Sequence, residues 1–245
     1  MKQDEKRMAV ISGGTSGIEL AAAQCMARDG WSVVLLGRDV EKGQRAAKAV
    51  QGSVFISCDV ADALACEMAL KEAAALGRIH TVVTSAGMYM EGLLENMTEE
   101  DIRRCFEINV YGTMHLVRAA LPYMKSGGGS IVTVASDAAL QGNVQCSVYG
   151  AAKGAITGFT RSVALELSVY NIRANCVCPG DIKTPLLEKQ LSAYGGDESE
   201  MADQYPLRRI GRPEEVGEVI AFLASDKASF MTGALVPVDG GLTDW

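Results

Sequence analysis

The sequence has few of the residues on which metal and nucleic-acid sites depend. It contains two histidines, His80 and His115, which lie far apart, and its seven cysteines are scattered. No metal site is therefore expected, and an odd number of cysteines in a chain of this length argues against a disulfide framework. Lysine and arginine form no dense run and the net charge is −7, which argues against nucleic acid as a partner.

Long hydrophobic runs are also missing. No segment approaches the roughly 20 apolar residues that a membrane-spanning helix needs, and the N-terminal MKQDEKRM mixes charges of both signs instead of forming the apolar region of a signal peptide. We therefore expect no membrane partner and a cytoplasmic location. With 48% apolar and 22% charged residues, the composition is that of a globular protein, and the length of 245 residues suits a single domain covering residues 1–245.

Short apolar runs alternate with longer helical patterns along the chain. Several of these runs, such as Ser32–Leu36, are continuously apolar, as in parallel strands that helices cover on both faces. The alternation predicts an α/β fold: a single-domain Rossmann fold with a doubly wound, parallel, seven-stranded sheet and helices on both faces. The strands are expected at Met8–Ile11, Ser32–Leu36, Val54–Ser57, Thr81–Thr84, Ser130–Val134, Ile172–Val177 and Leu235–Val238, and the helices near 17–29, 41–50, 62–75, 99–125, 148–170 and 214–224.

The regular pattern breaks between residues 179 and 213 into proline, glycine and charged residues. A connection of this length in a compact domain is either a functional lid or a disordered segment. Because it directly follows a predicted strand, we favour a substrate lid near residues 181–212. A partly apolar pocket beside it is expected from Met88, Tyr89, Met90, Leu140, Val144 and Cys146.

The first predicted strand runs into the glycine-rich segment SGGTSGIEL, residues 12–20. Gly13 and Gly17 precede a predicted helix, whose N-terminal N–H groups and dipole favour an anion such as a dinucleotide pyrophosphate. At the end of the second strand, Gly37 stands where an acidic residue would bind a ribose 2′-hydroxyl, and Arg38 follows, which suits a 2′-phosphate. The expected cofactor is therefore NADP(H), with NAD(H) as the alternative. Asp39 is placed to cap the next helix.

Tyr149 and Lys153 are four residues apart in a predicted helix, so that the phenol and the ammonium share one face. A nearby cation favours the phenolate and lets the phenol exchange a proton nearer neutral pH. Ser136 ends the fifth strand region thirteen residues earlier, and Asn109 lies twenty-seven residues before Ser136. The parallel sheet is expected to bring these residues to the edge that carries the glycine-rich segment.

With these motifs the whole sequence resembles the classical short-chain dehydrogenases/reductases, and residues 208–241 are similar to the 3-oxoacyl-carrier-protein reductase branch. The resemblance implies an NADP(H)-dependent oxidoreductase that interconverts a secondary alcohol and a ketone of a small-molecule substrate by hydride transfer. Tyr149 would be the general acid and base, and Lys153 would lower its pKa and hold the nicotinamide ribose. Ser136 would bind the reacting oxygen, and Asn109 would hold a water that relays protons.

The resemblance also implies the cofactor contacts and the assembly. Helices near 102–124 and 148–168 match the segments of the family's dimer interface, which implies a homotetramer. The implied cofactor-binding residues are Gly13, Thr15, Ser16, Gly17, Ile18, Arg38, Asp59, Val60, Ala86, Gly87, Tyr149, Lys153, Pro179, Gly180, Ile182 and Thr184.

Three functions are compatible with these residues. We prefer an enzyme acting on a free alcohol, polyol, hydroxy acid or sterol-like compound. A 3-oxoacyl-carrier-protein reductase is the alternative, but an acidic carrier protein needs a basic docking surface, and the segment 123–129 offers only Lys125. A non-catalytic dinucleotide-binding module is the third.

Two segments depart from the family pattern. Glu19 replaces the third glycine of the glycine-rich motif, and the usual Asn-Asn-Ala-Gly turn is Thr84-Ser85-Ala86-Gly87. The Glu19 carboxylate could point away from the ligand and stabilise the helix N-terminus by about 0.3–1 kcal/mol. It could instead face the pyrophosphate, where a charge about 6 Å away at an effective dielectric constant near 20 repels by about 2.8 kcal/mol. Glu19 could also mark a protein that no longer catalyses. We favour the first interpretation because the tetrad is complete.

Overall fold

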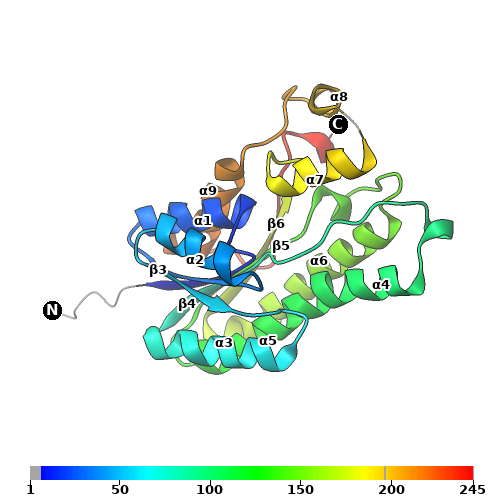
Figure 1. Ribbon diagram of the computed structural model, residues 1–245. Coiled ribbons are helices and arrows are strands. Elements are labelled where there is room, and N and C mark those ends of the chain that lie inside the picture. Colours follow the sequence, from blue (N-terminus) through cyan, green and yellow to red (C-terminus); the bar gives the residue numbers. More distant parts are fainter. Residues whose placement is uncertain (1–6, 196, 245) are drawn as a thin grey trace.

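Seven parallel strands form one sheet in the order β3-β2-β1-β4-β5-β6-β7 in the computed structural model, which describes residues 7–195 and 197–244 (Figure 1). All residues of the central β1 are buried and so are nearly all of β6, because helices cover both sides. The prediction of a doubly wound parallel sheet is confirmed, and each strand ends within two residues of its predicted bounds. The strands are β1 (Met8–Ser12), β2 (Ser32–Gly37), β3 (Ser53–Ser57), β4 (Ile79–Thr84), β5 (Gly129–Val134), β6 (Ile172–Pro179) and β7 (Leu235–Val238).

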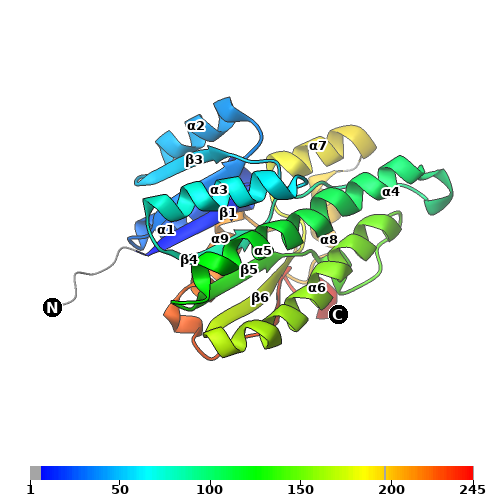
Figure 2. The same cartoon turned by 90° about the horizontal axis from the view of Figure 1, so that it is seen from below.

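Helices cover the sheet in two layers, one on each face (Figures 1 and 2). On one face lie α1 (Gly17–Arg28), α2 (Val40–Ala49) and α9 (Pro213–Ala224); on the other lie α3 (Ala63–Leu76), α5 (Gly112–Met124) and α6 (Ser147–Leu167). Each layer encloses its own apolar core, with Met26 and Ile220 in the first and Leu70 and Leu116 in the second. Across residues 7–195 and 197–244, no helix combines the length and the hydrophobicity needed to cross a bilayer.

A π-helical turn, Glu107–Tyr111, interrupts what the sequence predicted as one helix over 99–125. It separates α4 (Glu99–Phe106) from α5. The Asn109 side chain lies in this turn and donates from Nδ2 to the carbonyl of Cys105, four residues earlier, at 3.0 Å. The predicted helical stretch over 99–125 is confirmed, and the wider turn within it, which the sequence did not indicate, directs Asn109 toward the carboxyl ends of the strands. Such turns occur often at functional sites.

The segment after β6 is more regular than its sequence indicated. It contains α7 (Pro185–Tyr194) and α8 (Glu198–Asp203). The Thr184 side chain caps α7, and the Asp197 side chain accepts a hydrogen bond from the Ser199 N–H at the start of α8. The segment begins and ends beside the sheet, where Ile182 pairs with Gly211 as a parallel bridge. Its interior holds a small separate core, made by Leu187, Tyr205 and Ile210.

Candidate active site

A cleft of about 1270 Å³ lies at the carboxyl ends of the strands, and residues of α7 form part of its lining. It brings together all of the predicted site residues except one. Gly17 lies just behind the cleft wall, where a Cβ on it would come within 3.3 Å of the Thr184 side chain. The predicted residues that line the cleft are Gly13, Thr15, Ser16, Ile18, Arg38, Asp59, Val60, Ala86, Gly87, Asn109, Ser136, Tyr149, Lys153, Pro179, Gly180, Ile182 and Thr184.

The glycine-rich loop has the geometry of an anion cradle. Gly13 and Gly17 have positive φ angles of 79° and 61°, which side chains other than glycine rarely adopt. A Cβ at Gly13 would lie 3.2 Å from the Ala86 backbone, so the loop approaches the end of β4 closely. Among the described residues, the Ser16 side chain caps no N–H group of α1. The N-terminal N–H groups of α1 thus fit the pyrophosphate of a dinucleotide.

The end of the cleft beside β2 carries two cations. Arg38 Nη1 lies 3.9 Å from Asp59 Oδ2, and its side chain is 61% exposed. Lys42 also lines the cleft. The Asp39 carboxylate accepts a hydrogen bond from the Lys42 N–H at 3.0 Å, so its predicted capping of α2 is confirmed. Asp39 and Asp59 also line this end, and Lys42 Nζ lies 3.7 Å from Asp39 Oδ2, so the two cations stand beside two carboxylates.

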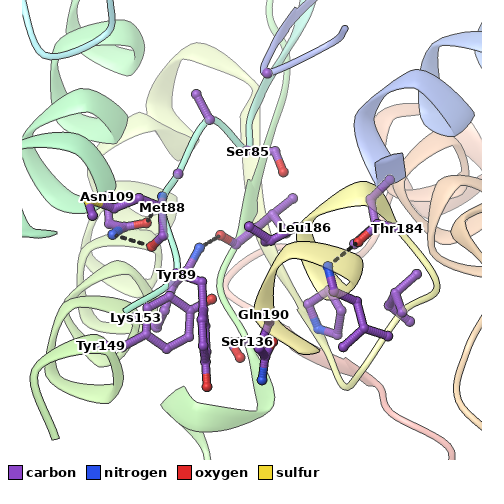
Figure 3. Close-up of a pocket in the computed structure, with 18 of the residues that line it drawn as sticks. Ser85, Met88, Tyr89, Asn109, Ser136, Tyr149, Lys153, Thr184, Leu186 and Gln190 are labelled. Atoms are coloured by element: carbon purple, nitrogen blue, oxygen red, sulfur yellow. Dashed lines mark hydrogen bonds between the residues drawn. The ribbon is translucent and has the colours of Figure 1, made fainter. Parts of the chain in front are cut away.

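Tyr149 and Lys153 occupy the first two turns of α6, which directs both side chains toward the cleft (Figure 3). Both residues are buried, with 9% and 6% of their surface exposed. Lys153 Nζ donates to the carbonyl of Val134 at 3.1 Å and lies 5.7 Å from the centre of the Tyr149 ring. Ser136 follows β5 on the same side of the cleft, and its Oγ donates to Asp137 at 2.7 Å.

Burial shifts the pKa of both Tyr149 and Lys153. It raises the pKa of Tyr149 above its ordinary value, and a hydrogen bond with Ser136 opposes the rise only in part. It lowers the pKa of Lys153. Desolvation is the largest effect on both groups. At neutral pH the phenol keeps its proton.

Asn109 holds the backbone that follows β4. Its Nδ2 donates to the Met88 carbonyl at 3.0 Å, and its Oδ1 accepts from the Met88 N–H at 3.2 Å (Figure 3). A Cβ on Gly87 would come within 2.6 Å of that Oδ1, so only glycine fits there. In this structure the side-chain amide of Asn109 serves to position the cleft wall.

Glu19 points into the cleft. Its Oε1 accepts a hydrogen bond from Ser85 Oγ at 2.5 Å, and both residues line the cleft. The favoured expectation, that this carboxylate points away from the ligand, was therefore wrong. The side chain turns inward because Ser85 supplies a hydroxyl donor. Burial raises the pKa of Glu19 to about 7, while the Ser85 hydrogen bond and the Lys153 charge act in the opposite direction.

The far end of the cleft carries three carboxylates that the sequence did not indicate: Glu91, Asp137 and Asp181. Each follows a different strand, and isolated acids in loops give no recognisable motif. Burial raises the pKa of Asp181, a hydrogen bond from Tyr205 opposes the rise, and the charges of the other two carboxylates add to it. The three charges therefore act on one another across the cleft.

The apolar pocket predicted here is only partly present. Met88, Val144 and Cys146 line the cleft, and the Tyr89 ring meets the Tyr149 ring edge-on at 5.0 Å between centroids (Figure 3). Met90 packs instead in a separate apolar cluster, and Leu140 is not among the described residues that line the cleft. Within 7–195 and 197–244, no group of three or more His, Cys, Asp or Glu side chains is arranged to hold a metal ion.

Comparisons with known proteins place this site in context. A family profile described as enoyl-(acyl carrier protein) reductase matches residues 13–243. The chain is 34% identical to trans-4-hydroxycyclohexanecarboxylate dehydrogenase of Sinomonas cyclohexanicum, over 97% of this chain and 93% of that protein. It is 35% identical to a 3-oxoacyl-[acyl-carrier-protein] reductase of Thermotoga maritima, over 97% of this chain and 98% of that protein. The fold is also similar to the crystal structure of a single-residue variant of actinorhodin polyketide ketoreductase with NADPH. The alignment covers 100% of both chains, with a TM-score of 0.93 and 26% sequence identity.

Proposed function

This chain belongs to the short-chain dehydrogenase/reductase family, and from that premise we propose an NADP(H)-dependent enzyme that interconverts a secondary alcohol and a ketone of a small molecule. The observation that carries the proposal is the convergence of Ser136, Tyr149 and Lys153 in the cleft that also holds the glycine-rich loop. The names of the relatives, a dehydrogenase and a reductase, support the same chemistry.

The residues of the cleft fit a nicotinamide dinucleotide. The N-terminus of α1 would hold the pyrophosphate, Lys153 the nicotinamide ribose, and Arg38 with Lys42 a 2′-phosphate. When bound, the cofactor supplies or accepts the two electrons of the reaction. The NADPH in the structure of the polyketide ketoreductase supports the choice of NADP(H).

Tyr149 is proposed to move the proton. Its raised pKa keeps the phenol protonated at neutral pH, which is the form that can donate a proton to the oxygen of a ketone as it becomes an alcohol. Ser136 would bind and orient that oxygen. Asn109 acts more remotely, because it positions the Met88 backbone at the cleft wall.

The charge of the cleft narrows the substrate class. Glu91, Asp137 and Asp181 would repel a carboxylate or a phosphate at the substrate end. Carboxylate oxygens accept hydrogen bonds from hydroxyl or ammonium groups. We therefore favour a neutral or cationic hydroxylated compound, such as a polyol, over the hydroxy acid that the sequence left open.

A 3-oxoacyl-carrier-protein reductase is the second candidate, favoured by the Thermotoga maritima relative. The scarcity of basic residues in the segment 123–129, which offers only Lys125, opposes it, because an acidic carrier protein needs a basic docking surface. A non-catalytic nucleotide-binding module is the third, and the inward direction of Glu19 is the observation in its favour.

We also propose that the segment 181–212 is a substrate lid and that the protein is a homotetramer. Leu186 and Gln190 of α7 line the cleft (Figure 3), which supports the first proposal. Exposed apolar side chains support the second: Tyr111, Leu165 and Val169 are 51%, 75% and 78% exposed in or beside α5 and α6. Light scattering after size-exclusion chromatography measures the assembly directly.

One assay separates the three functions. The purified protein is incubated with NADPH or NADH and a panel of polyol-derived ketones, carboxylated ketones and a 3-oxoacyl-carrier protein, and cofactor oxidation is followed by absorbance. We expect turnover of the uncharged ketones, with NADPH preferred and activity lost in Tyr149→Phe. Turnover confined to the acyl-carrier substrate would select the second candidate. Cofactor binding without any turnover would select the third.

A further inference from the structure

The two departures from the family sequence pattern lie against each other in the cleft. Glu19 belongs to the first turn of α1 and Ser85 follows β4, yet Ser85 Oγ donates to Glu19 Oε1 at 2.5 Å. The other carboxylate oxygen, Oε2, lies 3.5 Å from the point that a Cβ on Gly17 would occupy. One oxygen is thus held by the β4 side of the cleft, and the other faces the phosphate loop.

This arrangement is unfavourable for an ionised Glu19 beside a bound dinucleotide. The pyrophosphate carries negative charge, and a carboxylate about 6 Å from one such charge at an effective dielectric constant near 20 would weaken binding about a hundredfold. A carboxylic acid at the same place has no charge and gains an O–H donor. Because Ser85 already satisfies Oε1, the proton would reside on Oε2, the oxygen that faces the loop.

We propose that Glu19 is a cofactor-binding residue that acts in its neutral, protonated form, so that a dinucleotide binding to protein with ionised Glu19 takes up one proton at that residue. This inference rests on the proposed function, since it requires the cleft to bind a nicotinamide dinucleotide. The step is Glu19-COO⁻ plus a proton from solvent giving Glu19-COOH, with no bond to the cofactor formed or broken. Cofactor affinity then depends on pH through Glu19, which stands where the family pattern has a glycine.

The groups around Glu19 set the pH range. A hydrogen bond from Ser85 and one from the Glu19 backbone N–H stabilise the carboxylate, and the charge of Lys153 on α6 favours the same form. Thr184, before α7, packs against the neighbouring Gly17 and carries no charge. Burial opposes these effects and leaves the pKa of Glu19 at about 7. A bound pyrophosphate adds negative charge and raises the pKa further.

The test measures the dissociation constant of NADPH by fluorescence titration from pH 6 to pH 9 in three proteins. In the wild type we expect the constant to rise about fiftyfold to a hundredfold over this range. Glu19→Gln keeps the size and the donor but cannot ionise, so its profile should change less than threefold once the titration of NADPH itself is allowed for. Glu19→Gly restores the family residue and should give an equally flat profile, which also covers the case in which the glutamine variant fails to fold.

Calorimetry gives a second readout that does not depend on activity. NADPH binding at pH 7.5 in two buffers of different ionisation enthalpy should show uptake of about half a proton or more in the wild type, and correspondingly less in Glu19→Gln. Parallel pH profiles and equal proton uptake in the wild type and both variants would overturn the inference while leaving the proposed function intact. If neither NADPH nor NADH bound any of the three proteins at any pH, the proposed function itself would fail.

Discussion

Replacing Arg38 by alanine should weaken the binding of NADPH but not that of NADH. Arg38 lies where β2 ends, with its side chain 61% exposed and 3.9 Å from the Asp59 carboxylate. A phosphate monoester carries a charge of about −1.5 to −2 at neutral pH. A unit charge pair at about 4 Å and an effective dielectric constant near 20 gives about 4 kcal/mol. Exposure and salt reduce this to about 1–2 kcal/mol, a value typical of hydrogen bonds to charged groups.

The ion pair between Arg38 and Asp59 contributes little free energy by comparison. Exposed pairs contribute about 0–1 kcal/mol, so Asp59 does not compete strongly for the guanidinium. We therefore expect Arg38→Ala to raise the dissociation constant of NADPH about 5-fold to 30-fold. NADH, which lacks the 2′-phosphate, should change by less than about twofold. Fluorescence titration with both cofactors measures the two constants on the same protein sample.

Two matched variants sharpen the assay. Arg38→Lys keeps the charge but loses the bidentate geometry, so its NADPH affinity should fall between those of the wild type and Arg38→Ala. Lys42→Ala removes the second cation of the same end and should have a smaller effect than Arg38→Ala. If Arg38→Ala weakened NADH and NADPH equally, or left NADPH unchanged, the assignment of this end of the cleft to a 2′-phosphate would be refuted.

Three further outcomes are expected. Tyr149→Phe should lower turnover by about 10²- to 10⁴-fold with NADPH affinity within a few-fold of wild type; turnover near the wild-type rate would exclude the phenol as the proton donor. Gly87→Ala places a methyl group 2.6 Å from Asn109 Oδ1, so Tm should fall by several degrees for a cost of about 1–3 kcal/mol; an unchanged Tm would show that the contact relaxes freely. The pKa of Glu19 is raised from 4.5 to about 7, so the stability it contributes is fully present below pH 4.5 and is lost as pH rises through 7. The unfolding free energy of Glu19→Gln should therefore rise relative to that of the wild type between pH 5 and 8, by at most about 3 kcal/mol. Denaturant unfolding measures this difference, and a difference that stayed constant over the range would contradict the prediction.

The strands could be predicted closely because their sequence is governed by one simple condition. A parallel strand buried on both faces is a nearly continuous apolar run, and β1 and β2 follow that rule except at their end residues. The helix boundaries were harder where distant contacts decide them. The π-helical turn contains Asn109, whose side-chain amide bonds to the Met88 backbone twenty-one residues earlier, and no local sequence pattern indicates that pairing.

The residues of the site were predictable as a group, but the direction of each side chain was not. The ends of parallel strands meet at one edge of the sheet, which is why Ser136 and the Tyr149 helix share a cleft with the glycine-rich loop. The direction of Glu19 depends on Ser85, sixty-six residues further along the chain. Each departure from the family pattern was visible in the sequence, but their contact was visible only in three dimensions.

The small core of Leu187, Tyr205 and Ile210 has a consequence for how such proteins diverge. The segment that contains it leaves the sheet at Ile182 and returns beside the same residue at Gly211. Because its ends stay together and its interior packs on itself, insertions and exchanges within it leave the sheet undisturbed, and the entropic cost of added length grows slowly. Under the proposed function, changes confined to this segment alter the substrate preference, while Ser136, Tyr149 and Lys153 lie outside it and are unaffected.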